Sequence, residues 1–88
     1  MDGGQAEIIV YGTTWCSDTI RARRYLDNHK IPYKWIDIDK DNDARKFVEK
    51  TNRGYRSVPT IIFPDGSILV EPSDADLAAK LSSLGLAK

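Results

Sequence analysis

The order of its predicted strands and helices constrains the fold of this 88-residue chain more than any other feature. Short apolar and β-branched runs predict strands, and apolar residues spaced three and four apart predict helices. Pro64-Asp65-Gly66 has the composition of a hairpin turn between the last two strands. The expected elements are, in order, a strand at Glu7–Tyr11, a helix at Ile20–His29, a strand at Tyr33–Ile38, a helix at about Asp43–Thr51, strands at Thr60–Phe63 and Ser67–Val70, and a helix at about Asp74–Leu84. This βαβαββα order predicts one α/β domain at residues 7–86, preceded by a flexible tail at residues 1–6.

The single cysteine, Cys16, lies between the first predicted strand and the first predicted helix. Backbone N–H groups at the start of a helix lack partners, and the positive end of the helix dipole favours a negative charge there. Such a position favours the thiolate, which is the form that attacks disulfides. A lone cysteine can also be a small buried hydrophobe, but the exposed-looking Ser17-Asp18-Thr19 beside it favours a reactive thiol.

Composition and charge argue against several other classes of protein. Thirteen basic and thirteen acidic side chains give a formal net charge of zero, so we expect no nucleic-acid or membrane partner. No apolar run approaches the roughly 20 residues of a transmembrane helix, and the N-terminal residues lack a signal-peptide pattern. One cysteine cannot make an internal disulfide, so the fold does not depend on an oxidising compartment and we expect a cytoplasmic protein. We also expect a monomer. Cysteine and histidine do not cluster, so we expect no metal site.

Two motifs resemble the glutaredoxins of the thioredoxin-like superfamily. They are Trp15-Cys16 at the first strand–helix junction and Ser57-Val58-Pro59-Thr60 before the third strand. The resemblance covers nearly the whole chain, from about Ile8 to Leu84. It implies the thioredoxin fold, with a four-stranded mixed sheet and helices on both faces. It also implies a cis peptide bond between Val58 and Pro59 that faces Cys16, and a thiol–disulfide oxidoreductase that serves cell redox homeostasis.

Within this family the chain is most similar to the mycoredoxin branch, actinobacterial glutaredoxins that act on mycothiol mixed disulfides. The motifs that carry this similarity are Thr13-Thr14-Trp15-Cys16, Arg56-Ser57-Val58-Pro59-Thr60, and the tail from Asp65-Gly66-Ser67 through Pro72-Ser73. Dithiol glutaredoxins have Cys-x-x-Cys, whereas this chain has Cys16-Ser17-Asp18-Thr19, so an internal disulfide cycle is impossible. The implied cycle is therefore a monothiol one, in which Cys16 takes a small thiol from a protein mixed disulfide and a second small thiol regenerates it. The resemblance implies mycothiol or glutathione as the co-substrate, and Thr13 argues against glutathione because many glutaredoxins have a lysine there.

The candidate site residues follow from Cys16 as the nucleophile. Thr19, one helical turn further on, is expected to donate a hydrogen bond to the thiolate and is the second catalytic candidate. The resemblance implies that the Val58 backbone pairs with the small thiol and that the start of the last helix contacts the far end of the ligand. Trp15 either walls the cleft beside the thiol or is a packing residue. The full set of substrate-binding candidates is Thr13, Trp15, Arg53, Arg56, Val58, Pro59, Ser73, Asp74 and Asp76.

Other interpretations stay open at this point. Ser73 and Asp76 match a capping box, and Arg53 and Arg56 are equally compatible with a solvated loop. The carboxylate of Asp18 opposes a thiolate unless it points outward, toward Arg21. Two other functions are an iron–sulfur cluster carrier and a redox-inert binding module with the thioredoxin fold.

Overall fold

Strand β1 (Ile8–Gly12) organises the sheet because it pairs with a neighbouring strand along each of its edges. The computed structural model describes residues 7–86, so the predicted tail at residues 1–6 lies outside the described part. After β1 the chain forms α1 (Ser17–Asn28), β2 (Tyr33–Asp37), α2 (Asn42–Thr51), β3 (Thr60–Ile62), β4 (Ile68–Val70) and α3 (Asp74–Ser83). The predicted βαβαββα order is confirmed.

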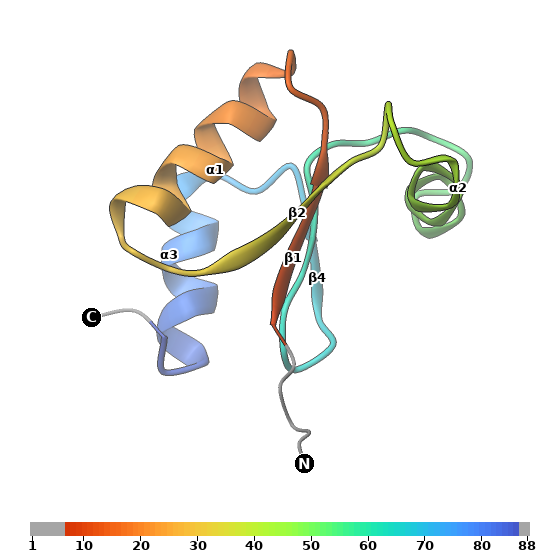
Figure 1. Cartoon of the computed structure of the whole chain (residues 1–88). Helices are drawn as coiled ribbons and strands as arrows, with labels where there is room; N and C mark the ends of the chain where they lie inside the picture. Colours follow the sequence, from red (N-terminus) through yellow and green to blue (C-terminus); the bar gives the residue numbers. More distant parts are fainter. Residues whose placement is uncertain (1–6, 87–88) are drawn as a thin grey trace.

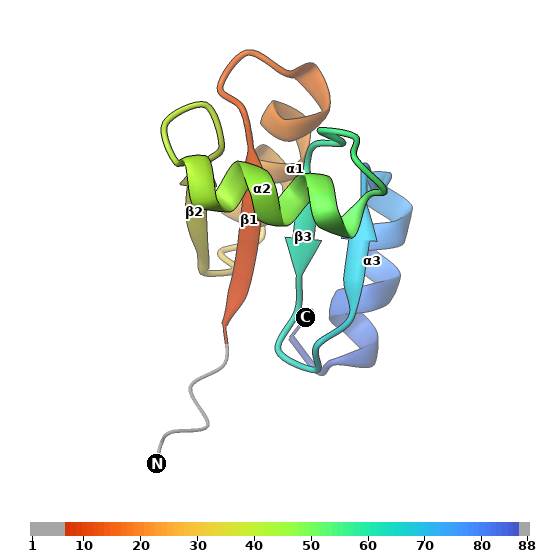
Figure 2. The same ribbon diagram turned by 90° about the vertical axis from the view of Figure 1, so that its right-hand side faces the viewer.

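The four strands form one mixed sheet in the order β2-β1-β3-β4. β2 runs parallel to β1, with Trp35 opposite Val10, whereas β3 runs antiparallel to β1, with Ile61 opposite Val10. β4 returns antiparallel to β3 through the predicted hairpin turn. Helices α1 and α3 cover one face of the sheet and α2 covers the other (Figures 1 and 2). The predicted thioredoxin-type α/β architecture is therefore confirmed.

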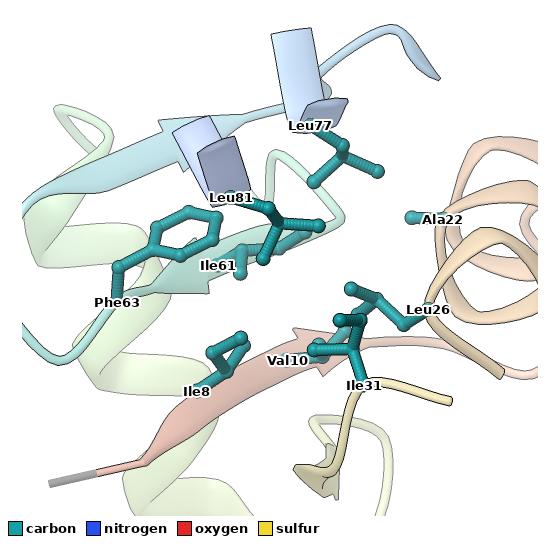
Figure 3. Close-up of a cluster of buried hydrophobic side chains, with 9 residues drawn as sticks. All are labelled: Ile8, Val10, Ala22, Leu26, Ile31, Ile61, Phe63, Leu77 and Leu81. Carbon is teal, nitrogen blue, oxygen red and sulfur yellow. The ribbon is translucent and has the colours of Figure 1, made fainter. Parts of the chain in front are cut away.

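The larger core lies between the sheet and the pair of helices α1 and α3 (Figure 3). Side chains alternate across a strand, so Ile8 and Val10 of β1 enter this core while Tyr11 packs on the α2 side. The buried members of the larger core are Ile8, Val10, Ala22, Leu26, Ile31, Ile61, Phe63, Leu77 and Leu81. A smaller core under α2 contains Ile38, Ala44 and Val48.

The start of α1 differs from the prediction. The helix begins at Ser17 rather than at Ile20, and Cys16 is its N-cap, with extended backbone (φ −81°, ψ 124°). Thr19, Ala22 and Leu26 are the buried residues of the helix, while Ile20 is 40% exposed. One residue corresponds to a rotation of about 100° around a helix, so the face that contains Thr19 excludes Ile20. The spacing of Ile20, Ala22, Arg23 and Leu26 predicts one shared helical face. This prediction is wrong for Ile20, which lies outside the buried face.

Both later helices begin at side-chain caps. Asp41 caps α2 by accepting from the Ala44 N–H at 3.0 Å. Ser73 caps α3 in a reciprocal capping box with Asp76, as the sequence pattern predicted. No helix within residues 7–86 is both long enough and apolar enough to cross a bilayer.

Candidate functional site

Cys16 is the N-cap of α1 and belongs to the connection between β1 and α1. This connection lies at the upper end of the sheet in Figure 1. The carbonyl oxygen of Cys16 accepts the N–H of Ile20 at 2.9 Å, which is the first backbone hydrogen bond of the helix. The backbone N–H groups in the first turn of α1 have no intrahelical acceptor, as at any helix start. They place positive partial charge around the cysteine. The thiol is free and partly exposed. This geometry suits a sulfur that must carry negative charge and be reached from solvent.

The Val58–Pro59 step faces this sulfur. Its peptide bond is cis, as the resemblance implied, and the thiol of Cys16 donates to the Val58 carbonyl oxygen at 3.8 Å. Two contacts hold the step in place: Thr60 donates its hydroxyl to the Ser57 carbonyl at 2.7 Å, and the Glu71 N–H donates to the Pro59 carbonyl at 2.8 Å. The predicted juxtaposition of residues 42 positions apart in the chain is confirmed.

Trp15 is not a core packing residue, because 72% of it is exposed. Its indole N–H donates to the Asp39 carboxylate at 2.8 Å, in the turn that follows β2. Asp39 is not among the site residues predicted from the sequence. A signal was available, because the carboxyl ends of the parallel strands β1 and β2 meet at one edge of the sheet. The role of Trp15 as a wall of the cleft stays a prediction.

Thr13 and Thr19 flank the cysteine in sequence, and both are buried. Neither hydroxyl has a hydrogen-bond partner within the described range, residues 7–86. Thr19 packs against the backbone of Gly12, so closely that a Cβ built on Gly12 would lie 2.6 Å from its methyl carbon. No hydrogen bond joins Thr19 to Cys16 in that range, so the predicted donation to the thiolate stays a prediction. Contact of Thr13 with the small thiol also stays a prediction and gains no support from its burial.

Arg21 connects the start of α1 to the start of α3. It pairs with Asp18 at 3.2 Å, donates to the Pro72 carbonyl at 3.0 Å and lies 3.6 Å from Asp74. The expectation that Asp18 points toward Arg21 is confirmed. Pairing with the Arg21 guanidinium reduces the electrostatic repulsion between the Asp18 carboxylate and a thiolate at Cys16.

The remaining candidates have partners other than Cys16. Ser73 and Asp76 bind each other in the capping box, at 3.0 and 3.1 Å, so the capping interpretation is confirmed. Arg56 is exposed and donates to Glu49 at 3.0 Å, and Arg53 lies in the same exposed loop with a positive φ of 58°. Ligand binding by these residues stays a prediction.

Neighbouring groups add little charge chemistry of their own. Burial, with a smaller contribution from the carboxylate of Asp41, raises the pKa of Tyr11, so this phenol stays neutral at physiological pH. Among residues 7–86, no group of three or more His, Cys, Asp or Glu is arranged to hold a metal ion. The chemistry of the described site therefore centres on the one sulfur.

Comparison with known proteins gives a consistent result. The family model described as Glutaredoxin matches residues 8–68. A protein of Mycobacterium tuberculosis named as a glutaredoxin is 40% identical over 76 residues, which cover 86% of this chain and 90% of that protein. Mycoredoxin 1 of Corynebacterium glutamicum is 33% identical over 79 residues, which cover 90% of this chain and 98% of that protein.

Solved structures agree with the sequence relatives. The glutaredoxin from Archaeoglobus fulgidus superposes with a TM-score of 0.69 and 26% identity, covering 86% of each chain. A thioredoxin-like protein superposes with a TM-score of 0.76 and 25% identity, covering 86% of this chain and 95% of that one. These similarities favour neither the cluster carrier nor the redox-inert module. The chain belongs to the glutaredoxin family and is a thiol–disulfide oxidoreductase that acts through a single cysteine with a low-molecular-weight thiol.

Proposed function

We propose that this glutaredoxin reduces mixed disulfides between proteins and mycothiol, with Cys16 as its only redox-active sulfur. The observation that carries the proposal is the partly exposed thiol at the start of α1, 3.8 Å from the Val58 carbonyl, in a chain with no second cysteine. A monothiol of this kind needs a small thiol to complete each cycle, because nothing in the chain can resolve a disulfide on Cys16.

The cycle consists of two exchange steps. In the first, the thiolate of Cys16 attacks the mycothiol sulfur of the mixed disulfide, and the protein leaves as a thiolate that takes up a proton. The new bond joins Cys16 to mycothiol. In the second step, the thiolate of another mycothiol attacks the mycothiol sulfur held on Cys16, which releases oxidised mycothiol and the free Cys16 thiolate. Each step breaks one S–S bond and forms one, so the disulfide passes from the protein to oxidised mycothiol. The second mycothiol, which goes from thiol to disulfide, is the reductant.

Mycothiol is preferred to glutathione on two grounds. Thr13 stands where many glutaredoxins place a lysine. Mycothiol has fewer carboxylates than glutathione, so it loses less binding affinity when this lysine is absent. The similarity to mycoredoxin 1 also extends over 98% of that protein. We assign the cysteinyl part of the ligand to the Val58 backbone, beside Pro59 and Thr13, with Trp15 as the wall on the other side of Cys16.

The remaining contacts are assigned by the chemistry of the side chains. Arg53 or Arg56 would donate to polar groups of the ligand, and Arg56 would have to exchange its partner Glu49 to do so. Ser73, Asp74 and Asp76 are proposed to contact the far end, where carboxylates can accept from sugar hydroxyls. Thr19 is proposed to assist the thiolate during the reaction. The cytoplasmic location and the monomeric state stay predictions.

The test compares two small thiols on one protein substrate. A protein carrying mycothiol in a mixed disulfide is reduced with mycothiol, the same protein carrying glutathione is reduced with glutathione, and Cys16→Ser serves as the control. We expect turnover with mycothiol at least tenfold faster than with glutathione, and none above background for Cys16→Ser. Equal or faster turnover with glutathione would reject the ligand assignment, and no turnover with either thiol would reject the monothiol cycle in this chain.

A further inference from the structure

The indole of Trp15 is exposed and hydrogen-bonded at the same time. It is 72% exposed, yet its one polar atom is bound to the Asp39 carboxylate at 2.8 Å. A hydrogen bond to an ionised acceptor is stronger and more directional than a neutral one, so it restricts the rotation of the ring. An exposed tryptophan with a fixed orientation presents a large apolar face at low entropic cost on binding.

The turn that carries Asp39 is itself held in place. The backbone N–H of Asp39 donates to the side chain of Asp37 at 2.9 Å, and the Lys40 N–H donates to the Asp37 carbonyl at 3.1 Å. The intervening Ile38 is buried in the smaller core, and its N–H donates to the Gly12 carbonyl at 3.0 Å. The carboxylate is therefore fixed relative to the end of β1, and the chain runs directly from that end to Trp15.

The sheet order places the two neighbours of the sulfur on opposite sides of β1. Figure 2 shows β2 and β3 on opposite sides of β1. Val58 lies in the segment that leads into β3, whereas Asp39, which binds the Trp15 indole, follows β2. A mixed disulfide brings two different groups to one sulfur. If the small thiol occupies the Val58 side, the protein half of the substrate meets the side bounded by Trp15.

We propose that Asp39 is a positioning residue, which fixes the exposed indole of Trp15 as an apolar contact for the protein half of the mixed disulfide. The inference rests on the proposed function for its substrate. It deepens that function, because it separates a protein-facing side of the site from a thiol-facing one. Aromatic residues at the centre of an interface commonly dominate its affinity, so the loss of the fixed indole affects recognition of the protein more than the exchange chemistry.

The kinetic test compares two substrates that carry the same small thiol. One is a protein with mycothiol in a mixed disulfide, and the other is the mixed disulfide of mycothiol with free cysteine. For Asp39→Ala we expect kcat/KM to fall about tenfold with the protein, mainly through KM, and at least fivefold less with the small substrate. Asp39→Asn, whose amide oxygen still accepts a hydrogen bond, should recover most of the loss. Asp43→Ala removes an exposed carboxylate from the first turn of α2 and serves as the control with wild-type kinetics.

Two further measurements ask whether Asp39 acts through the indole. In a Trp15→Phe background, which lacks the N–H, Asp39→Ala should have no additional effect on kcat/KM. In a Trp35→Phe background, where Trp15 is the only tryptophan, Asp39→Ala should increase the fast component of the fluorescence anisotropy decay, and Asp43→Ala should not.

The outcomes separate the inference from the proposed function. Equal losses with both substrates, or an additional loss from Asp39→Ala in the Trp15→Phe background, would overturn the positioning role. An unchanged anisotropy decay in Asp39→Ala would also overturn it, and this measurement needs no turnover. Failure of the unmodified chain to reduce either substrate would reject the proposed function, and with it the protein-facing role of Trp15.

Discussion

Two buried threonines provide a matched pair for testing how this fold treats hydroxyl groups. Thr19 and Thr60 are each 0% exposed. The Thr19 hydroxyl has no hydrogen-bond partner within residues 7–86, whereas the Thr60 hydroxyl donates to the Ser57 carbonyl at 2.7 Å and accepts from the Asn52 amide at 3.1 Å. Replacement by valine keeps the branched shape and exchanges the hydroxyl for a methyl group at both positions.

The expected changes in stability have opposite signs. A buried hydroxyl without a partner costs about 1–3 kcal/mol, and the added methyl contributes about 0.8 kcal/mol of burial. Threonine and valine have similar helix propensities, so Thr19→Val should raise the free energy of unfolding by at least about 1 kcal/mol. Thr60→Val leaves the Ser57 carbonyl without its donor and should lower the free energy of unfolding by about 1–3 kcal/mol.

Urea and thermal denaturation of both variants measure this difference. A change of 1 kcal/mol corresponds to roughly 4–8 °C in Tm for a domain of this size. We therefore expect the Tm of Thr19→Val above that of the parent and the Tm of Thr60→Val below it. Equal destabilisation of both variants would show that the Thr19 hydroxyl has a partner in solution, and would refute the reasoning from its isolation.

The remaining predictions concern packing at the end of β1 and the ion pair between Asp65 of the β3–β4 turn and Lys80 of α3. A Cβ at Gly12 would lie 2.6 and 2.8 Å from side-chain atoms of Thr19, so Gly12→Ala should lower the free energy of unfolding by about 1–2 kcal/mol, an overpacking cost partly offset by lower chain entropy in the unfolded state. Urea denaturation of the double variant Gly12→Ala/Thr19→Ala should show most of this loss relieved, because the crowded side chain is removed. Additive changes in the free energy of unfolding would contradict the clash. Hydrogen bonds from Ser67 first, and then from Lys80, hold the pKa of Asp65 well below its ordinary value of 3.8. Because the folded-state pKa is lowered, this stabilisation is present above pH 4 and is lost as the pH falls through the folded-state value. Asp65→Asn should therefore flatten the decline of Tm with acidification below pH 4, and an unchanged decline would refute this assignment.

The sequence by itself determined the features that depend on neighbouring residues. Alternation and β-branching located the strands, and the Ser73-x-x-Asp76 pattern predicted the capping box that begins α3. The Pro64-Asp65-Gly66 turn was also predicted, because hairpin turns depend on the conformations open to a few adjacent residues. The single cysteine by itself limits the chemistry to a monothiol cycle. Its contact with the Val58–Pro59 step followed only from the resemblance to a family.

The tertiary structure decided which side chains meet across the site. The Trp15–Asp39 bond joins residues 24 positions apart, and Arg21 reaches a carbonyl 51 positions away. Neither contact has a local sequence signature, because it depends on how strands are ordered in the sheet and how α1 lies against α3. The burial of Thr19 in place of Ile20 has a similar cause: the face of α1 that is covered depends on where the helix begins and what packs on it. Local sequence specifies backbone conformation, whereas long-range packing specifies the partners of each side chain.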